Sequence, residues 1–309
     1  MPSAMLSSTV TFVAMDTCIS VQVISSESED VLQNVFDRIQ EWFFQVEQVC
    51  NRFDEQSEVY HLANTPGIPV KVSPLLFLVL HFSLEVARLS EGAFDPALGY
   101  QLVKAGFDQH YLTREKTTYR PPPGERPTYR DILLDTRQQT VTLNRPLLLD
   151  LGGVAKGLAI DLAVQELAAF SDYAINAGGD LYIRGCNERQ EPWRIGIRHP
   201  RQSQHCLARL HGSWKDGMAI CTSGDYERQS PSTAAHHLFD PRTGHPAGET
   251  ASVTVMAPGA MLADALSTAA FVLGPGEGVR LLQRCGLDGV IFSSTLEAFM
   301  TPGMRRYLL

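Results

Sequence analysis

The residues whose types and spacing could do chemistry include a carboxylate and a hydroxyl one helical turn apart. Asp264 and Thr268 stand at positions i and i+4 in a run of small and apolar residues, so a helix would place both oxygens on one face. Oxygen-only ligands suit Mg²⁺, which would be shared with the phosphates of a bound ligand. The same spacing also occurs on an ordinary helix face, and the pair alone does not separate the two interpretations.

Two glycine-rich stretches indicate an anion site. Residues 150–157 read Asp-Leu-Gly-Gly-Val-Ala-Lys-Gly after the apolar run 146–149, which predicts a strand, a tight turn and the start of a helix. Such a junction offers free backbone N–H groups and a helix N-terminus to a phosphate. Residues 176–180, Asn-Ala-Gly-Gly-Asp, repeat the theme. Together the two stretches predict a ligand that contains a pyrophosphate.

Several further residues could contact a ligand, and each also has an ordinary structural interpretation. His237 precedes an Asp-Pro-Arg-Thr-Gly turn and could act as a general base or only shape a loop. Thr222 and Ser223 follow a predicted strand and could bind phosphate or ribose, or cap a turn. Asp95 could accept a hydrogen bond from a ligand. Alternatively, it could only belong to the turn between a C-cap glycine and the proline that stops the helix. Phe53 could stack on a ring or belong to the core.

The spacing of apolar residues predicts the elements that position these side chains. It predicts a strand over 9–24, a helix from Ser28 through Val49, and a helix that begins at Ser73-Pro74 and ends near Gly92. The remaining predicted elements are strands over 131–135, 140–144, 147–151, 173–176, 181–184, 193–198, 218–222, 252–256 and 289–293, and helices over 155–170, 260–273 and 277–285. Because strands and helices do not alternate strictly, this order favours an α+β fold with a mixed or antiparallel sheet.

Composition limits the class of protein. The chain has 309 residues, 44% hydrophobic content and a formal net charge of -8, which suits a globular core and argues against a nucleic-acid surface. No segment has the ~20 apolar residues of a membrane span, and no export or lipid-anchor signal is visible, so we expect a cytoplasmic protein. The six scattered cysteines are expected to be free thiols. We expect one domain over 1–309, with a subdomain boundary near 120–128 as the alternative.

The order of the motifs is more specific than any one of them. In this order the sequence contains Met-x-Thr, Arg-Phe-x-x-x-Ser-Glu-Val, Gly-Ala-Phe-Asp-Pro, Asp-Leu-Gly-Gly-Val-Ala-Lys-Gly, Asn-Ala-Gly-Gly-Asp, Trp-Arg-Ile-Gly-Ile-Arg, Thr-Ser-Gly-Asp-Tyr-Glu-Arg, His-Leu-Phe-Asp-Pro-Arg-Thr-Gly and Ala-Asp-Ala-Leu-Ser-Thr-Ala. This succession resembles the ApbE family, the FAD:protein FMN transferases, from about Met15 to Thr268 and beyond. The resemblance implies a T-fold-like α+β core that binds FAD at a Mg²⁺ site. It also implies transfer of FMN to a threonine or serine hydroxyl of an acceptor protein, with release of AMP.

The resemblance assigns roles to individual residues. His237 and Asp264 are the implied catalytic residues, with His237 as the base that removes the acceptor proton. Asp264, Thr268 and the backbone carbonyl of Gly153 would hold Mg²⁺, and Phe53 would stack on the isoalloxazine ring. The residues implied to contact FAD are Met15, Phe53, Ala93, Phe94, Asp95, Asp150, Lys156, Asn176, Gly178, Gly179, Asp180, Thr222, Ser223 and Leu238.

Some positions depart from the family's pattern, and three of them bear most on the implied site. Asp16 replaces a glycine, Ala97 replaces a threonine, and Met261 stands where some relatives have an acidic residue. An Asp16 side chain that points inward would weaken FAD binding. These departures keep a non-catalytic flavin-binding protein open as an interpretation. A FAD pyrophosphatase that yields FMN and AMP also stays open, because it would need the same site as the transferase.

Overall fold

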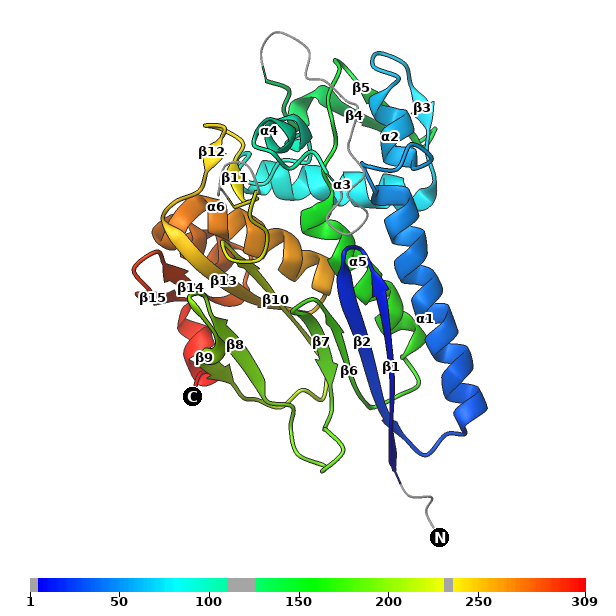
Figure 1. The fold of residues 1–309 in the computed structure, drawn as a ribbon, viewed down its shortest axis with the longest axis vertical. Helices are drawn as coiled ribbons and strands as arrows, with labels where there is room; N and C mark the ends of the chain where they lie inside the picture. The colour runs from blue at the N-terminus through cyan, green and yellow to red at the C-terminus, as the bar shows by residue number, and fades with distance from the viewer. Residues whose placement is uncertain (1–4, 110–125, 231–235) are drawn as a thin grey trace.

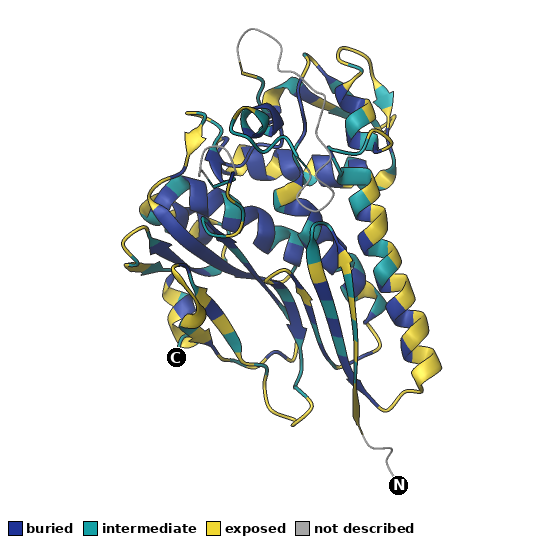
Figure 2. Ribbon diagram, in the orientation of Figure 1, coloured by how far each residue is buried: buried dark blue, intermediate teal, exposed yellow. Residues whose placement is uncertain are grey.

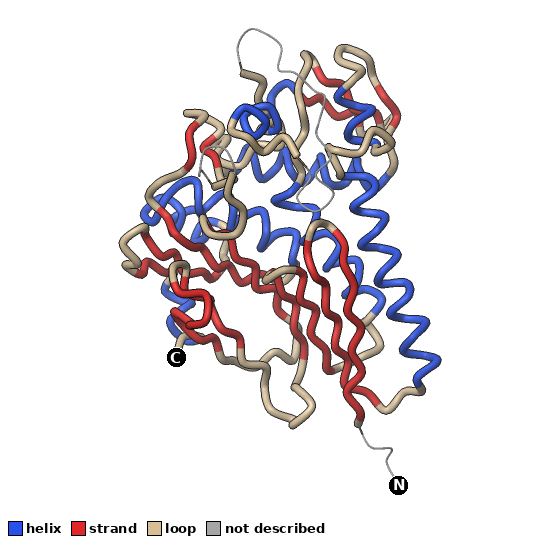
Figure 3. The backbone as a smooth tube through the Cα atoms, in the orientation of Figure 1, coloured by secondary structure: helices blue, strands red, loops and turns tan. Residues whose placement is uncertain are grey.

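An antiparallel sheet with helices on one face organises the chain (Figure 1, Figure 3). The computed structural model describes residues 5–109, 126–230 and 236–309. In the main sheet the strand order is β1-β2-β6-β7-β10-β13-β14-β15, and all neighbours pair antiparallel. The predicted α+β class is therefore confirmed. Its strands are β1 (Leu6–Ala14), β2 (Thr17–Ser25), β6 (Asp172–Ala177), β7 (Asp180–Arg184), β10 (Met218–Gly224), β13 (Thr250–Ala257), β14 (Asp288–Ser293) and β15 (Ala298–Met300).

Three long helices form the layer that covers one face of this sheet. They are α1 (Glu29–Cys50), α5 (Gly152–Glu166) and α6 (Ala260–Arg284), and α5 packs against both of the others. A smaller group of elements lies beyond the end of the sheet (Figure 1). It comprises α2 (Glu58–Ala63), α3 (Pro74–Leu89), α4 (Gly99–Lys104) and the small sheet of β3 (Val70–Lys71), β5 (Thr140–Leu143) and β4 (Ile132–Asp135).

The other face of the sheet is covered over only part of its width. The hairpin of β8 (Ile195–His199) and β9 (Gln202–Leu210) packs there, together with the 3-10 segment Pro302–Arg306. Apolar side chains from the hairpin and the sheet form a second, smaller core around Trp214. Consequently every residue of β13 is buried, whereas β1 alternates between exposed and half-buried side chains (Figure 2).

The helices agree best with the sequence-based expectations. Helix α1 begins one residue after Ser28, although the Ser28 side chain makes no capping hydrogen bond. Helix α3 has the predicted cap, because Ser73 Oγ accepts a hydrogen bond from the Leu76 N–H at 3.2 Å. The two helices expected over 260–273 and 277–285 form one element, α6, that is kinked at Gly274 with φ of 81° before Pro275.

Two strand predictions are wrong. The single strand expected over 9–24 is a hairpin, because Met15 and Asp16 have φ of 54° and 62° and turn the chain back. The strand expected over 147–151 is an irregular buried segment. Its backbone bonds instead to the loop before α4, where the Asp150 N–H donates to the Pro96 carbonyl at 2.8 Å.

All six cysteines are free thiols, as expected. No helix within the described ranges has the length and apolar character that a membrane crossing requires. Part of the segment proposed as a subdomain boundary, residues 120–125, lies outside the described residues.

Candidate functional site

A cavity of about 740 Å³ lies where the hairpin β1–β2, the ends of α1 and α5, the end of β10 and helix α6 meet. Most residues implied to bind FAD or a metal line it, although they come from distant parts of the chain. These are Met15, Phe53, Ala93, Phe94, Asp95, Asp150, Gly153, Lys156, Gly178, Asp180, Thr222, Ser223, His237, Leu238, Asp264 and Thr268.

Two of the expected contact residues do not line this cavity. Asn176, near the end of β6, and Gly179, in the turn that follows, are both exposed, and Asn176 Oδ1 accepts a hydrogen bond from the Gly179 N–H at 2.9 Å. The pair shapes the turn that presents Gly178 and Asp180 to the cavity. The glycine-rich pattern thus includes residues that build the turn as well as residues that face the cavity.

The glycine turn before α5 is fixed by a carboxylate. Asp150 Oδ1 accepts a hydrogen bond from the Gly152 N–H at 3.1 Å, and Asp150 Oδ2 pairs with Arg52 Nε at 2.7 Å. Arg52 is buried and also donates to the Phe107 carbonyl at 2.9 Å. The start of the helix is therefore tied both to the end of α1 and to the loop after α4.

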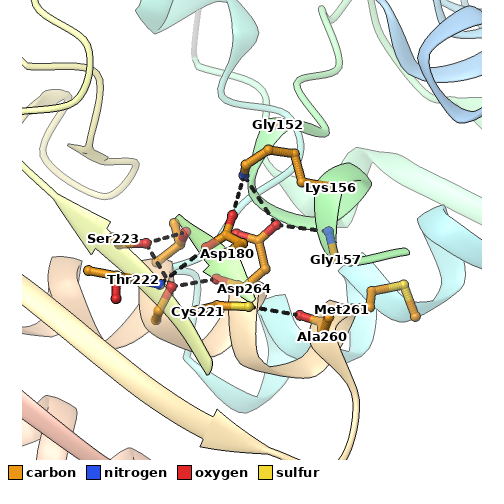
Figure 4. Close-up of polar contacts among 12 residues, drawn as sticks. Gly152, Lys156, Gly157, Asp180, Cys221, Thr222, Ser223, Ala260, Met261 and Asp264 are labelled. Atoms are coloured by element: carbon orange, nitrogen blue, oxygen red, sulfur yellow. Dashed lines mark hydrogen bonds and ion pairs between the residues drawn. The ribbon is translucent and has the colours of Figure 1, made fainter. Parts of the chain in front are cut away.

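A lysine lies between two buried carboxylates at the base of the cavity (Figure 4). Lys156 Nζ is 2.8 Å from Asp180 Oδ2 and 3.5 Å from Asp264 Oδ2. The backbone also holds both acids, because the Gly157 N–H donates to Asp264 Oδ2 at 3.2 Å and the Thr222 N–H donates to Asp180 Oδ1 at 3.1 Å.

Burial sets the electrostatics of this acid–lysine cluster, defined by Lys156, Asp180 and Asp264. Burial raises the pKa of the Asp264 carboxyl, Lys156 opposes that shift, and the like charge of Asp180 adds to it. Burial acts to lower the pKa of Lys156, but the two carboxylates outweigh it and raise that pKa overall. The ammonium therefore stays charged and partly neutralises the two acids.

Hydroxyl groups extend the cluster along α6. Ser223 Oγ lies 2.7 Å from Ser267 Oγ and 3.2 Å from Thr268 Oγ1. Thr268 also faces the glycine turn, since a Cβ added to Gly153 would lie 3.2 Å from Thr268 Oγ1. Thr268, one helical turn after Asp264, thus lies beside Gly153 at the glycine turn, and their role as metal ligands stays a prediction.

The donor atoms of this region suit a hard cation only if a ligand completes its coordination. Within the described ranges, no group of three or more His, Cys, Asp or Glu side chains could hold a metal ion. The donors beside the glycine turn include the Asp264 carboxylate, the Thr268 and Ser223 hydroxyls and backbone carbonyls. Oxygen donors of this kind fit Mg²⁺ that retains phosphate or water ligands. Among the cavity-lining residues, carboxylates also outnumber cationic side chains, so an anionic ligand would need additional positive charge.

Aromatic and apolar residues form the other end of the cavity. The Arg52 guanidinium lies 4.1 Å from the centroid of the Phe53 ring, which fixes the ring at the end of α1. The Met15 N–H donates to Glu47 Oε1 at 2.9 Å, so the turn between β1 and β2 is tied to the same helix. Asp16 is also among the lining residues, and the departure from glycine therefore lies at the cavity.

Asp95 holds its own loop in place. Asp95 Oδ1 accepts a hydrogen bond from the Ala97 N–H at 2.8 Å, and Oδ2 accepts one from the Tyr129 N–H at 3.0 Å. Burial raises the pKa of this carboxyl to about 6 against the effect of these two bonds. Its first role is to fix the conformation of the loop that carries Ala93 and Phe94.

His237 is held as a neutral imidazole. Its backbone N–H donates to the Arg228 carbonyl at 3.2 Å, and Nδ1 lies 3.3 Å from the same oxygen. A carbonyl can only accept, so Nδ1 carries the proton and Nε2 keeps a lone pair. Burial, followed by the charge of Arg228, lowers the pKa of His237 to about 3.

Residues to which the sequence analysis assigned no role also line the cavity. Arg228 and Phe107 contact His237, and Arg52 binds Asp150. The only sequence signal for the two arginines is their position within motifs. Arg52 directly precedes Phe53, and Arg228 ends the stretch that begins with Thr222-Ser223. Phe107 follows no recognisable pattern.

Comparison with known proteins adds independent information. The profile of the ApbE family matches residues 15–291. A FAD:protein FMN transferase of Haemophilus influenzae is 29% identical over 292 residues, which cover 89% of this chain and 80% of that protein. The FAD:protein FMN transferase of Treponema pallidum is 33% identical over 294 residues, covering 86% of this chain and 78% of that protein.

Solved structures agree with this relationship. The ApbE protein of Thermotoga maritima superimposes with a TM-score of 0.84 at 28% sequence identity, covering 98% of this chain and 99% of that one. The flavin transferase ApbE of Vibrio cholerae has the same fold, with a TM-score of 0.82 at 21% identity over 98% of this chain and 99% of that one. Since the profile spans most of the sequence and the motifs meet in one cavity, this chain belongs to the ApbE family.

Proposed function

We propose that this protein transfers the FMN moiety of FAD to a threonine or serine hydroxyl of an acceptor protein and releases AMP. The observation that carries the proposal is that one cavity joins the acid–lysine cluster, the Ser223 and Thr268 hydroxyls and the aromatic side chain of Phe53. These features suit the phosphates and the ring of a flavin dinucleotide. The cavity volume of about 740 Å³ is within the range typical of small-molecule sites.

The proposal includes Mg²⁺, held by Asp264, Thr268 and the Gly153 backbone carbonyl. Two features support it, the oxygen-only donors at this place and the excess of carboxylates among the residues that line the cavity. When bound, the metal would neutralise charge on the pyrophosphate. Lys156 would hold Asp180 and Asp264 in place for that role.

The residues of the chain would contribute binding, orientation and proton removal. In the reaction, the acceptor oxygen forms a bond to the phosphorus next to riboflavin, and the bond from that phosphorus to the bridging oxygen breaks, so AMP leaves. The hydroxyl proton would pass to Nε2 of His237, whose lone pair is left free by the contact between Nδ1 and the Arg228 carbonyl. Phosphate anions bound beside this imidazole would raise its pKa above the value set by burial.

Product analysis tests the proposal and separates it from the two alternatives. Purified protein would be incubated with FAD and Mg²⁺, with and without a threonine-containing acceptor protein, and the nucleotides separated by chromatography. Transfer predicts AMP release that depends on the acceptor, with the flavin retained on the acceptor after denaturation. Free FMN and AMP in equal amounts without acceptor would instead establish hydrolysis. Bound but intact FAD in both mixtures would establish a flavin-binding protein.

A further inference from the structure

Among the described residues that line the cavity, the cationic side chains are Arg52, Lys104, Lys156 and Arg228, and they are not equivalent. Lys104 is exposed on α4. Arg52 is engaged by Asp150 at 2.7 Å, and Lys156 is engaged by Asp180 at 2.8 Å and Asp264 at 3.5 Å. Both cations are therefore already neutralised by protein carboxylates. A ligand phosphate would compete with those carboxylates for either of them.

Arg228 differs from both. It lines the cavity and is half-buried. Within the described ranges, no carboxylate lies within 4.0 Å of its guanidinium. A guanidinium without such a partner keeps its full positive charge, and the other charged residues that line this cavity are mostly acidic.

The acidic neighbours of Arg228 in sequence are directed elsewhere. Asp225 forms a two-pronged ion pair with Arg201, with N–O distances of 2.6 and 2.7 Å. Glu227 pairs with Arg198, so both acids are bound to the β8–β9 hairpin. These two contacts fix the turn after β10 and leave the Arg228 side chain without an acidic partner among the residues that the structure describes.

The backbone of Arg228 is fixed as well, because its carbonyl accepts the bond from the His237 N–H at 3.2 Å. The charge of its guanidinium lowers the pKa values of Arg52, Lys156 and His237, all of which line the cavity. The positive charge is thus close enough to act throughout the polar end of the site.

We propose that Arg228 binds the pyrophosphate of FAD directly, in addition to the metal, and that it stabilises the charge that develops there during transfer. This inference rests on the proposed function, because it assumes that the cavity takes FAD. A guanidinium offers parallel N–H donors that match two phosphate oxygens. In phosphoryl transfer, donors held at the phosphate oxygens stabilise the transition state and the leaving group.

The test compares ligands with and without phosphate. Binding of FAD and of riboflavin would be measured by flavin fluorescence for the wild type, Arg228→Gln and Arg228→Lys, in Mg²⁺ and in EDTA. Arg280→Gln is the matched control, because Arg280 pairs with Glu277 on the exposed surface of α6. We expect Arg228→Gln to raise the Kd for FAD about tenfold to a hundredfold, the scale of one lost charge-assisted bond. Its Kd for riboflavin should not change.

The remaining arms decide whether the contact is direct. The loss should persist in EDTA, and Arg228→Lys should recover part of it because an ammonium still attracts phosphate. Equal weakening of FAD and riboflavin, a loss seen only with Mg²⁺, or an unchanged Kd for FAD in both variants would each overturn the proposal. If the wild type does not bind FAD, the proposed function itself fails. If the wild type transfers FMN while the variants bind FAD normally, only the role of Arg228 fails.

Discussion

Replacing Gly157 by alanine should separate the two helices that carry the acid–lysine cluster. Gly157 lies in α5 where it crosses the start of α6. An added Cβ would lie 2.5 Å from the Ala260 carbonyl oxygen and 2.5 Å from Met261 Cα. Both are backbone atoms, so no side-chain rotation can relieve the overlap, and the helices must move apart by about 1 Å to restore ordinary contact.

The magnitude follows from three contributions. Overpacking of a close contact costs about 1–3 kcal/mol. Moving α5 also stretches the hydrogen bond from the Gly157 N–H to Asp264 Oδ2, now 3.2 Å, and a bond to a charged group contributes about 1.5–3 kcal/mol. The higher helix propensity of alanine offsets about 1 kcal/mol. We therefore expect the free energy of unfolding to fall by about 2–4 kcal/mol, allowing for partial loss of the bond.

Urea unfolding followed by tryptophan fluorescence measures this change. Gly276→Ala is the matched control, because Gly276 is also a helical glycine, in α6. The nearest atom to its added Cβ would be Arg280 Nη2 at 3.7 Å, which is an ordinary van der Waals distance. That variant should be neutral or up to about 1 kcal/mol more stable. If Gly157→Ala unfolds within about 0.5 kcal/mol of the wild type, the close approach of the two helices is not a constraint, and the reasoning fails.

Three further predictions concern the site. Asp264→Asn should abolish the rise in melting temperature that Mg²⁺ produces in the presence of FAD, together with AMP release. The reason is that it removes the carboxylate charge one helical turn before Thr268 in α6. An unchanged Mg²⁺ response would remove Asp264 from the metal site. Phe53→Ala should weaken FAD affinity by about 1 kcal/mol, or about fivefold in Kd, through loss of ring stacking; equal affinities in a fluorescence titration would contradict this. His237 should stay neutral to below pH 5 in a histidine NMR titration, because burial lowers its pKa to about 3. The unfolded chain binds that proton more readily, so stability is lost as pH falls from about 6.5 toward 3, and His237→Gln should flatten this part of the profile.

Helix positions could be predicted because their signals are local. The apolar spacing through α1 and the Ser73-Pro74 start of α3 each depend on residues within a few turns. The kink of α6 was equally visible, since Gly274 and Pro275 interrupt the pattern. These features needed no knowledge of what the helices pack against.

Strand boundaries depended on contacts that the sequence does not show. The hairpin turn at Met15 and Asp16 uses two non-glycine residues with positive φ, whereas the usual turn signals are Asn-Gly or Asp-Gly. The apolar segment 147–150 resembles a strand, yet its backbone bonds to Pro96, in the loop before α4, and to Gly99, the first residue of α4. Hydrophobicity predicted that the run is buried but not how its backbone is satisfied.

The site was predictable through its motifs and incomplete without geometry. Motif order identified Asp264, Thr268 and Lys156, and the fold brings them into one cavity. The ionic partners of these residues were not predictable, because the Arg52–Asp150 pair joins positions 98 residues apart. That Arg228 has no carboxylate partner in the described part of the chain was equally hidden, since it depends on where its acidic neighbours point.

The most direct test of the central claim is the intact mass of an acceptor protein after incubation with this protein, FAD and Mg²⁺. The account predicts that the acceptor gains the mass of one FMN group, lost when its threonine is replaced by alanine or when Asp264→Asn replaces the wild-type enzyme. It also predicts one AMP released for each acceptor labelled. An acceptor of unchanged mass while FAD is consumed, or a mass gain that the Asp264 variant preserves, would contradict it.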